Sequence, residues 1–212
     1  MKNNIIAREG YPFIIVAVAI GLFFLFLKLI IASSIFWLIA IFIVWFFRNP
    51  ERIIPQNERA IVSPADGKII EVVKCYEDRY LKEKAVKISI FMSIFNVHIN
   101  RAPISGKVKN IFYNKGKFLT ANRDKASKEN EQNAIIIETA DGINTLIVQI
   151  AGFIARRIVC YIKSEDTLVK GMRFGLIRFG SRVDIFLPEN IDIKVAIGAK
   201  VRGGETILGY LK

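Results

Sequence analysis

The N-terminal part of the chain is almost entirely apolar. Within residues 13–47 the only polar or charged side chains are Lys28, Ser33 and Ser34. One straight helix over this range would be about 52 Å long at ~1.5 Å per residue, far more than a hydrocarbon core of ~30 Å. A turn near residues 28–34 would divide it into two helices. Both halves are apolar on every face, unlike a helix of a soluble domain, so the pattern predicts an N-terminal helical membrane hairpin.

Basic residues flank both ends of this stretch. Lys2 and Arg8 precede it, and Arg48, Arg52 and Arg59 follow it. A hairpin places its two ends on one side of the membrane, and the positive-inside rule makes that side cytoplasmic. The rest of the protein is therefore expected at the cell membrane, on its cytoplasmic face.

Beyond the apolar stretch the pattern changes to short β-rich runs separated by Gly, Pro, Asp and Asn. We expect residues 1–50 to form the anchor and residues 51–212 to form a mainly β domain, a sandwich or a barrel. The predicted strands cover 68–74, 85–92, 107–113, 134–138, 144–150, 157–163, 182–187, 191–195 and 206–211.

Three local patterns refine this picture. Gly67-Lys68 and Gly106-Lys107 each follow a proline three residues before the glycine, a faint internal echo. The segment 198–208 has the Gly-x-x-Val-x-x-Gly-Glu cadence of a lipoyl-like hairpin, without the Met-Lys-Met attachment site of such carriers. Residues 116–133 are rich in Lys, Asn and Glu and are predicted to form a long loop.

The composition limits the classes of partner and the kinds of site that this chain can have. The net charge of +12 calls for an anionic partner, nucleic acid or anionic lipid. No basic cluster interleaved with aromatic residues suggests a base-stacking platform, and the apolar stretch favours membrane lipid over nucleic acid. Two separated cysteines, Cys75 and Cys160, exclude a disulfide scaffold. With His98 as the sole histidine and no zinc-type spacing, no metal site is expected.

Four polar features can carry chemistry: Asp66 in an Asp-Gly pair, His98, the Gly180-Ser181 pair and the Arg156-Arg157 pair. Each has an ordinary structural explanation, respectively a turn, a packed histidine, a turn before a strand and a solvated edge. The order Asp66, His98, Ser181 permits a Ser-His-Asp hydrolase, although the Gly-x-Ser-x-Gly elbow is absent.

Taken together, these segments resemble the phosphatidylserine decarboxylase proenzymes, particularly the short bacterial and archaeal form. The resemblance covers nearly the whole chain in order, and its most specific motif is Gly-Leu-Ile-Arg-Phe-Gly-Ser-Arg-Val-Asp. The matching segments after the hairpin are 46–52, 63–67, 91–103, 130–131, 152–159 and 175–184.

This resemblance implies self-cleavage between Gly180 and Ser181. Attack of Ser181 Oγ on the Gly180 carbonyl gives an ester, and β-elimination then leads to a pyruvoyl group at residue 181. The products would be a large chain 1–180 and a small chain 181–212, a heterodimer whose higher homo-oligomeric state is left open. The pyruvoyl cofactor would form a Schiff base with phosphatidylserine and yield phosphatidylethanolamine and CO2.

The resemblance also assigns roles to two further residues. His98 matches the first motif histidine and is implied as the acid–base group of decarboxylation. Asp66 matches the family's Ala-Asp-Gly aspartate and is implied as a catalytic residue of the self-cleavage, where it would help to deprotonate Ser181 or to position the Gly180 carbonyl. Arg101 stands where many long-form members carry a second histidine. The alternatives are a membrane-anchored serine hydrolase, a decarboxylase of archaeal ether-linked serine lipids (archaetidylserine), and a non-enzymatic lipoyl-like adaptor.

Overall fold

The structure is a computed structural model that describes residues 4–116, 130–152, 157–178 and 181–212. The chain divides into two compact units, Met1–Glu51 and Arg52–Lys212.

The first unit is a pair of antiparallel helices, α1 (Tyr11–Phe26) and α2 (Ile30–Phe46), preceded by the short 3-10 helix η1 (Arg8–Gly10). Lys28 adopts φ 60° in the turn between the helices. Ser33 Oγ donates a hydrogen bond to the Gly21 carbonyl at 2.9 Å, so small residues hold the two helices together. The predicted pair of helices is present.

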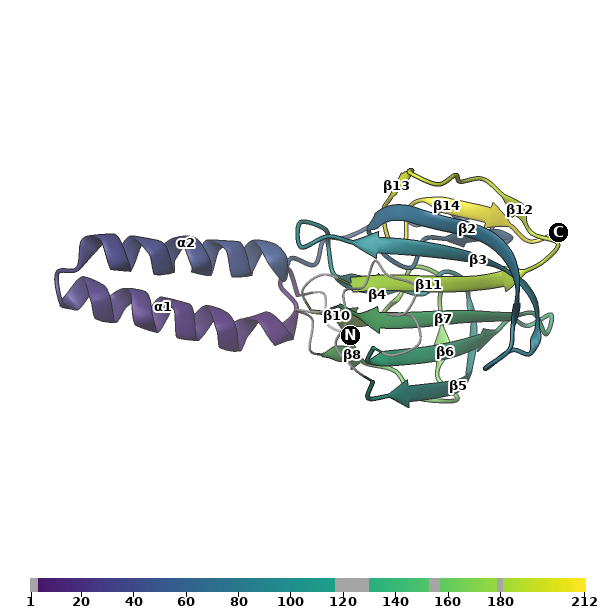
Figure 1. The fold of residues 1–212 in the computed structure, drawn as a ribbon, viewed down its shortest axis with the longest axis horizontal. Helices are drawn as coiled ribbons and strands as arrows, with labels where there is room; N and C mark the ends of the chain where they lie inside the picture. Colours follow the sequence, from purple (N-terminus) through teal and green to yellow (C-terminus); the bar gives the residue numbers. More distant parts are fainter. Residues whose placement is uncertain (1–3, 117–129, 153–156, 179–180) are drawn as a thin grey trace. The chain divides into compact units, whose positions relative to one another are not determined.

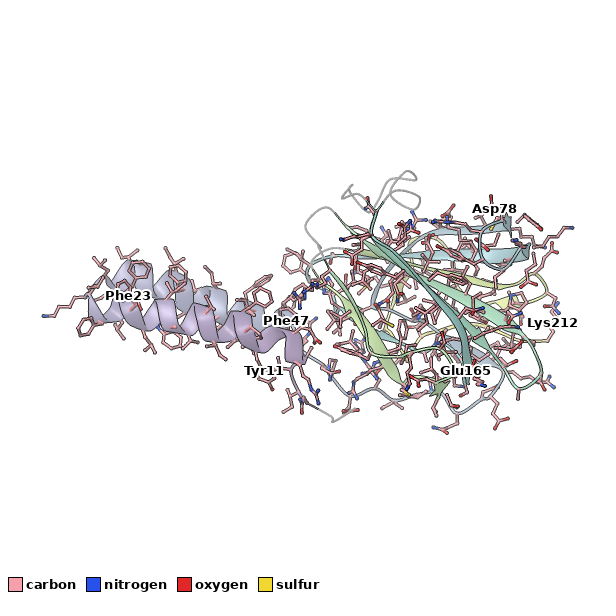
Figure 2. All side chains as sticks on the ribbon, turned by 90° about the horizontal axis from the view of Figure 1, so that it is seen from below. Tyr11, Phe23, Phe47, Asp78, Glu165 and Lys212 are labelled. Atoms are coloured by element: carbon pink, nitrogen blue, oxygen red, sulfur yellow. The ribbon has the colours of Figure 1, made fainter. Side chains whose placement is uncertain are left out.

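Most other side chains of the helix pair are exposed and apolar, Phe23 among them (Figure 2). The helical segment Arg8–Phe26 is long and apolar enough to cross a membrane, whereas Ile30–Phe46 is apolar but shorter. An apolar surface of this kind is unfavourable in water, because each exposed side chain loses its hydrophobic transfer free energy.

The second unit is mainly β, as predicted (Figure 1). Its large antiparallel sheet has the order β13-β2-β3-β11-β7-β6-β5-β9, and two three-stranded sheets have the orders β1-β14-β12 and β4-β10-β8. The strand bounds are β1 Ala60–Val62, β2 Gly67–Glu77, β3 Glu83–Met92, β4 Ile99–Arg101, β5 Gly106–Asn114, β6 Gln132–Glu138, β7 Asn144–Ala151, β8 Ile158–Cys160, β9 Thr167–Leu168, β10 Arg173–Ile177, β11 Ser181–Pro188, β12 Asp192–Ile193, β13 Lys200–Val201 and β14 Ile207–Tyr210.

One buried apolar cluster joins residues of the large sheet with residues of both small sheets, and it forms the main core. All nine predicted strands have counterparts. The sequence missed β1, β4, β9, β10 and β13, which have two to five residues each and are too short for a clear period-two pattern. The predicted loop 116–133 is too long at its end, because Gln132 and Asn133 already pair in β6.

The structure does not bear out a paired hairpin over the predicted lipoyl-like segment 198–208. Its two strands do not pair with each other: β13 pairs with β2 in the large sheet, and β14 pairs with β1 and β12 in a small sheet.

The large sheet contains an internal twofold repeat. From its centre outwards, β11-β3-β2-β13 repeats the succession β7-β6-β5-β9. The sequence echo marks the equivalent starts of β2, at Gly67, and β5, at Gly106. A Cβ added to Gly67 would lie 2.3 Å from the Phe91 carbonyl oxygen, and a Cβ added to Gly106 would lie 2.4 Å from the Glu138 carbonyl oxygen. Only glycine allows such a close approach of two backbones.

The same repeat relates the two small sheets to each other: the strands β1-β14-β12 are equivalent to β4-β10-β8. The two copies exchange reciprocal backbone hydrogen bonds of 2.9 Å each, from Val62 N to the Pro103 carbonyl and from Arg101 N to the Pro64 carbonyl. The fold is therefore two similar halves around one core.

The second copy, β4 to β10, is inserted into the first copy between β3 and β11. Within the inserted copy β6 and β7 are joined by a tight turn in which Thr139 N donates to the Ile143 carbonyl at 2.9 Å. In the first copy the equivalent of this turn lies between the end of β3 and the start of β11, where Met92 lies opposite Ser181. Ser181 therefore begins its strand where the other copy has only a hairpin turn.

Candidate active site

Ser181 is the first residue of β11 and is fully buried. The strand runs between β3 and β7, so that Ser181 lies opposite both Met92 and Ala151. These cross-strand neighbours share one face of the sheet, the face that carries the main core. Ser181 Oγ lies 3.3 Å from Met92 Sδ. Gly180 and Arg156, two residues that the sequence singled out, lie outside the described residues.

A chain of buried amides approaches the same sulfur atom. Asn100 Nδ2 lies 3.8 Å from Met92 Sδ. Asn100 Oδ1 accepts a hydrogen bond from Gln149 Nε2 at 2.8 Å, and Gln149 Oε1 accepts one from Asn133 Nδ2 at 2.9 Å. The three amides are at most 2% exposed. Sequence reasoning missed them, and only Gln149, a polar residue inside the predicted strand 144–150, offered a usable signal.

His98 lies just before β4 and is 3% exposed. Its Nδ1 is 2.9 Å from the Asn96 carbonyl oxygen. Since a carbonyl only accepts, Nδ1 carries the hydrogen in the neutral ring, and Nε2 is then the nitrogen able to take a proton. The His98 carbonyl accepts a hydrogen bond from Ile177 N at 3.3 Å, which ties it to the last residue of β10, four positions before Ser181.

Asp66 lies at the same end of the large sheet as Ser181. It precedes Gly67 in β2, which is separated from β11 by β3, so the two backbones are roughly 10 Å apart at ~4.8 Å per strand. Its carboxylate accepts two hydrogen bonds from Arg52 Nη2, at 2.8 and 3.0 Å, and one from Gly203 N at 2.7 Å.

The internal repeat separates two roles of Asp66. Ser105, its counterpart in the other copy, accepts the equivalent hydrogen bond from Lys170 N at 3.0 Å through its Oγ. The bond to Gly203 N therefore belongs to the general architecture of the repeat. The buried ion pair with Arg52 is the feature that the Ser105 position does not reproduce, since a serine carries no charge.

Arg101, at the position of the long-form histidine, is 5% exposed. Its Nη1 donates to the Gly171 carbonyl at 2.9 Å. A Cβ added to Gly204, which has φ 82°, would lie 2.9 Å from Arg101 Cδ. Arg101 and Asp66 thus lie on either side of the Gly203-Gly204 turn.

The residue after Ser181 is held on the opposite face of the sheet, another feature that the sequence did not reveal. Arg182 is 2% exposed, and its guanidinium makes two hydrogen bonds to Asp184, at 2.6 and 3.0 Å. The same group donates to Ser89 Oγ at 2.9 Å and to Glu71 at 3.3 Å. These contacts fix the backbone at residue 182 and hence the position of Ser181.

Charges around Glu71 decide its ionisation. Partial burial by itself opposes the charged form, but hydrogen bonds from Lys87 and Ser89, with the charges of Lys87 and Arg182, lower the pKa of Glu71 below its ordinary value. Glu71 therefore stays a carboxylate at neutral pH and pairs with Lys87 Nζ at 2.6 Å.

The two thiols are unsuited to nucleophilic chemistry. Burial raises the pKa of both Cys75 and Cys160, which keeps them protonated at neutral pH. Among the described residues, no group of three His, Cys, Asp or Glu side chains could hold a metal ion.

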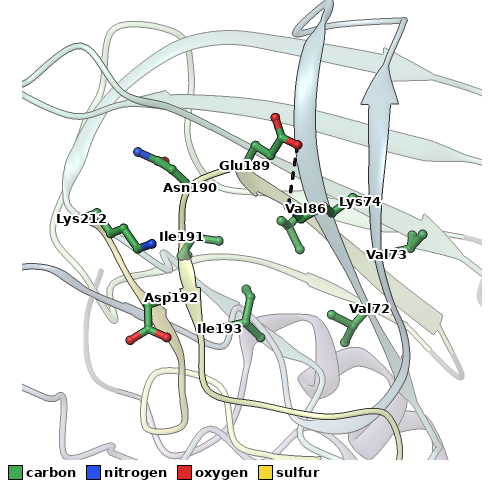
Figure 3. A pocket seen from close by; sticks show the side chains of 10 residues that line it. All are labelled: Val72, Val73, Lys74, Val86, Glu189, Asn190, Ile191, Asp192, Ile193 and Lys212. Carbon is green, nitrogen blue, oxygen red and sulfur yellow. Dashed lines mark ion pairs between the residues drawn. The ribbon is translucent and has the colours of Figure 1, made fainter.

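A cavity of about 380 Å³ lies at the other end of β11, beyond Pro188 (Figure 3). It is lined by Val72, Val86 and Ile193, and an ion pair of 3.7 Å joins Lys74 and Glu189 at its edge. Val72, the lining residue nearest to Ser181 in the strand register, is level with Ile185, roughly 13 Å along the strand from Ser181 at ~3.3 Å per residue. This cavity is therefore separate from the candidate site.

Comparison with known proteins gives a consistent picture. The family model described as phosphatidylserine decarboxylase matches residues 39–209. Proteins named phosphatidylserine decarboxylase proenzyme are 51% identical in Geotalea uraniireducens, 52% in Geobacter sulfurreducens and 49% in Paraburkholderia phymatum. Each of these alignments covers 99% of this chain and 98% of the relative. With a match of this extent, the chain belongs to the phosphatidylserine decarboxylase family.

Proposed function

We propose that this chain is a phosphatidylserine decarboxylase proenzyme that cuts itself between Gly180 and Ser181. The observation that carries the proposal is a fully buried serine at the first position of β11, where the fold returns from an inserted repeat. Family membership favours this activity over the serine hydrolase and lipoyl-like adaptor alternatives. A decarboxylase of archaeal ether-linked serine lipids would act on the same headgroup.

Self-cleavage begins with the Ser181 hydroxyl. Its oxygen attacks the preceding carbonyl and forms an ester, and the loss of the Ser181 proton needs a base. β-Elimination then breaks the bond between Cβ and Oγ and leaves the upstream chain with a carboxylate. Burial of Ser181 keeps bulk water away from its hydroxyl group, which is therefore available for the intramolecular attack.

The cut chain would remain one folded body. The small chain 181–212 contains β11, which lies between β3 and β7 of the large chain 1–180. Its strands β13 and β14 pair with β2 and β1, also of the large chain. We therefore propose a stable heterodimer of the two chains.

The surroundings of residue 181 fit a small buried carbonyl group. Met92 and Ala151 flank this position without bringing a charge, and both are fully buried. A pyruvoyl group at this position would supply a ketone able to condense with the amine of the serine headgroup and to accept the electron pair released with CO2. His98, hydrogen-bonded through Nδ1, would hold or deliver the proton at Nε2.

Reductive trapping tests the electrophile. We expect that incubation with phosphatidylserine and a borohydride reductant attaches the lipid amine covalently to the small chain 181–212, as read by mass spectrometry of the separated chains. The reason is that the proposed electrophile, the ketone of the pyruvoyl group, is formed at residue 181. Attachment to a lysine of the large chain would identify another electrophile and contradict the proposal.

The helix pair would keep the enzyme beside a substrate that stays in the bilayer. The apolar segment Arg8–Phe26 and the flanking arginines support an anchor whose two ends lie on the cytoplasmic side. The net charge of +12 would add attraction to anionic headgroups.

Removal of residues 1–47 tests the anchor. The shortened protein should leave the membrane fraction, and its turnover of bilayer phosphatidylserine should fall far more than its turnover of a short-chain soluble analogue. Proximity to lipid is lost, whereas Ser181, His98 and Asp66 all belong to the second unit. Equal losses on both substrates would show that the helices support the catalytic unit itself.

A further inference from the structure

The side chains of Asn100 and Ser181 both approach the sulfur atom of Met92. Asn100 lies in β4, is fully buried, and directs Nδ2 toward Met92 Sδ at 3.8 Å. Ser181 Oγ lies 3.3 Å from the same sulfur. Two hydrogen-bond donors therefore converge on one thioether, which is a weak acceptor.

Gln149 fixes the orientation of the Asn100 amide. Its Nε2 donates to Asn100 Oδ1 at 2.8 Å, and its own Oε1 is taken by Asn133 Nδ2 at 2.9 Å. Since the oxygen of Asn100 is held by a donor, the amino group must point to the sulfur. The amide cannot rotate without losing these buried hydrogen bonds.

The internal repeat shows that the fold itself does not need this polar pair. The strand register makes Ile61 the counterpart of Asn100 and Leu187 the counterpart of Gln149. Both counterparts are at most 1% exposed and belong to the main core. Placing two amides where the other copy has aliphatic side chains costs free energy wherever a buried donor lacks a strong acceptor, as Asn100 Nδ2 does opposite the Met92 sulfur. Because Asn100 and Gln149 lower the stability of the fold relative to the aliphatic pair, we look to a chemical role for them.

The weak acceptor gives that role a physical basis. A donor that is fully satisfied in the resting state gains nothing when charge develops nearby, whereas a poorly satisfied donor gains a strong hydrogen bond. Met92 keeps the Asn100 amino group oriented without saturating it. The group is thus ready for an oxygen that becomes negatively charged.

We propose, building on the self-cleavage above, that Asn100 Nδ2 donates a hydrogen bond to the original Ser181 Oγ during β-elimination. In this step the bond between Cβ and Oγ breaks and its electron pair stays on Oγ, which becomes a carboxylate oxygen of the upstream chain. The Cα proton passes to the same base that first removes the hydroxyl proton of Ser181, and its bonding pair forms the double bond between Cα and Cβ. Asn100 stabilises the developing carboxylate, and Gln149 is a positioning residue that aims Asn100.

The test follows the 24.0 kDa full-length precursor over time after cell-free synthesis. Asn100→Leu should slow the appearance of the small chain by about 10²–10³-fold, the usual effect of removing one such donor. Asn100→Asp should cleave slowly at neutral pH and faster as the pH falls, because only the protonated acid can donate. A purely structural role would not produce this pH dependence.

A matched control is Thr145→Val, which removes another fully buried polar atom from the same strand as Gln149 and should leave the cleavage rate unchanged. Thermal unfolding identifies variants that do not fold. If Asn100→Leu is one of them, Gln149→Leu retains the Asn100 side chain but removes the hydrogen bond that orients it, and cleavage at the wild-type rate in that variant would overturn the proposal.

The outcomes separate this inference from the proposed function. An uncut wild-type chain contradicts self-cleavage itself. A wild-type chain that is cut, together with folded Asn100 variants that are cut equally fast, overturns only the role of Asn100. Faster cleavage of Asn100→Asp with rising pH would mean that the residue acts through its oxygen as an acceptor, which also contradicts the proposal.

Discussion

Ser181→Ala is expected to yield a single uncut chain of about 24.0 kDa with no decarboxylase activity. Alanine has no oxygen to attack the preceding carbonyl and no leaving group at Cβ, so neither the cut nor the pyruvoyl group can form. The change removes one buried hydroxyl whose only described contact is the sulfur of Met92, so β11 should still form. Denaturing gel electrophoresis and a headgroup assay measure both losses.

Ser105→Ala is the matched control, because Ser105 lies in the other copy of the repeat and should not affect the cut. Ser181→Cys keeps a nucleophile at Cβ and should cut slowly. A Ser181→Ala protein that still releases CO2 from phosphatidylserine would remove the proposed mechanism, since its electrophile would have to come from elsewhere.

His98→Ala should separate decarboxylation from the cut. We expect the chains 1–180 and 181–212 to form, while turnover of phosphatidylserine falls by about 10²–10⁴-fold, the usual contribution of one positioned acid–base group. The bond from Nδ1 to Asn96 leaves Nε2 as the nitrogen that exchanges the proton. Steady-state turnover, measured per mole of small chain, gives the effect on the chemical step alone.

A variant of similar volume distinguishes chemistry from packing. His98→Gln keeps much of the volume but cannot exchange a proton, so its turnover should fall as that of His98→Ala does, whereas a packing role would let it recover. An uncut His98→Ala protein would show that the sole histidine serves both reactions, and that Arg101 has not relieved it of a part in maturation.

The sequence by itself determined the parts of this protein that follow from local patterns. The uniform apolar character of residues 13–47 allows only helices with an exposed apolar surface, and Lys28 marks the turn between them. The nine alternating runs all form strands, since a side chain in a strand must face either the core or solvent. The motif around Ser181 identified the family, because its residue types are tied to one chemistry.

Only the tertiary structure decided what surrounds Ser181. Asn100, Gln149 and Asn133 are spread over β4, β7 and β6, and no spacing along the chain predicts that their amides form one chain of hydrogen bonds. The Arg52–Asp66 ion pair looked like a basic flank and a turn residue until the fold buried them together. The echo at Gly67 and Gly106 became an internal repeat only once strand pairing was known, because register is a relation between distant segments. Local sequence fixes which face a side chain takes, whereas the neighbours on that face come from other strands, and those neighbours set the chemistry of the buried serine.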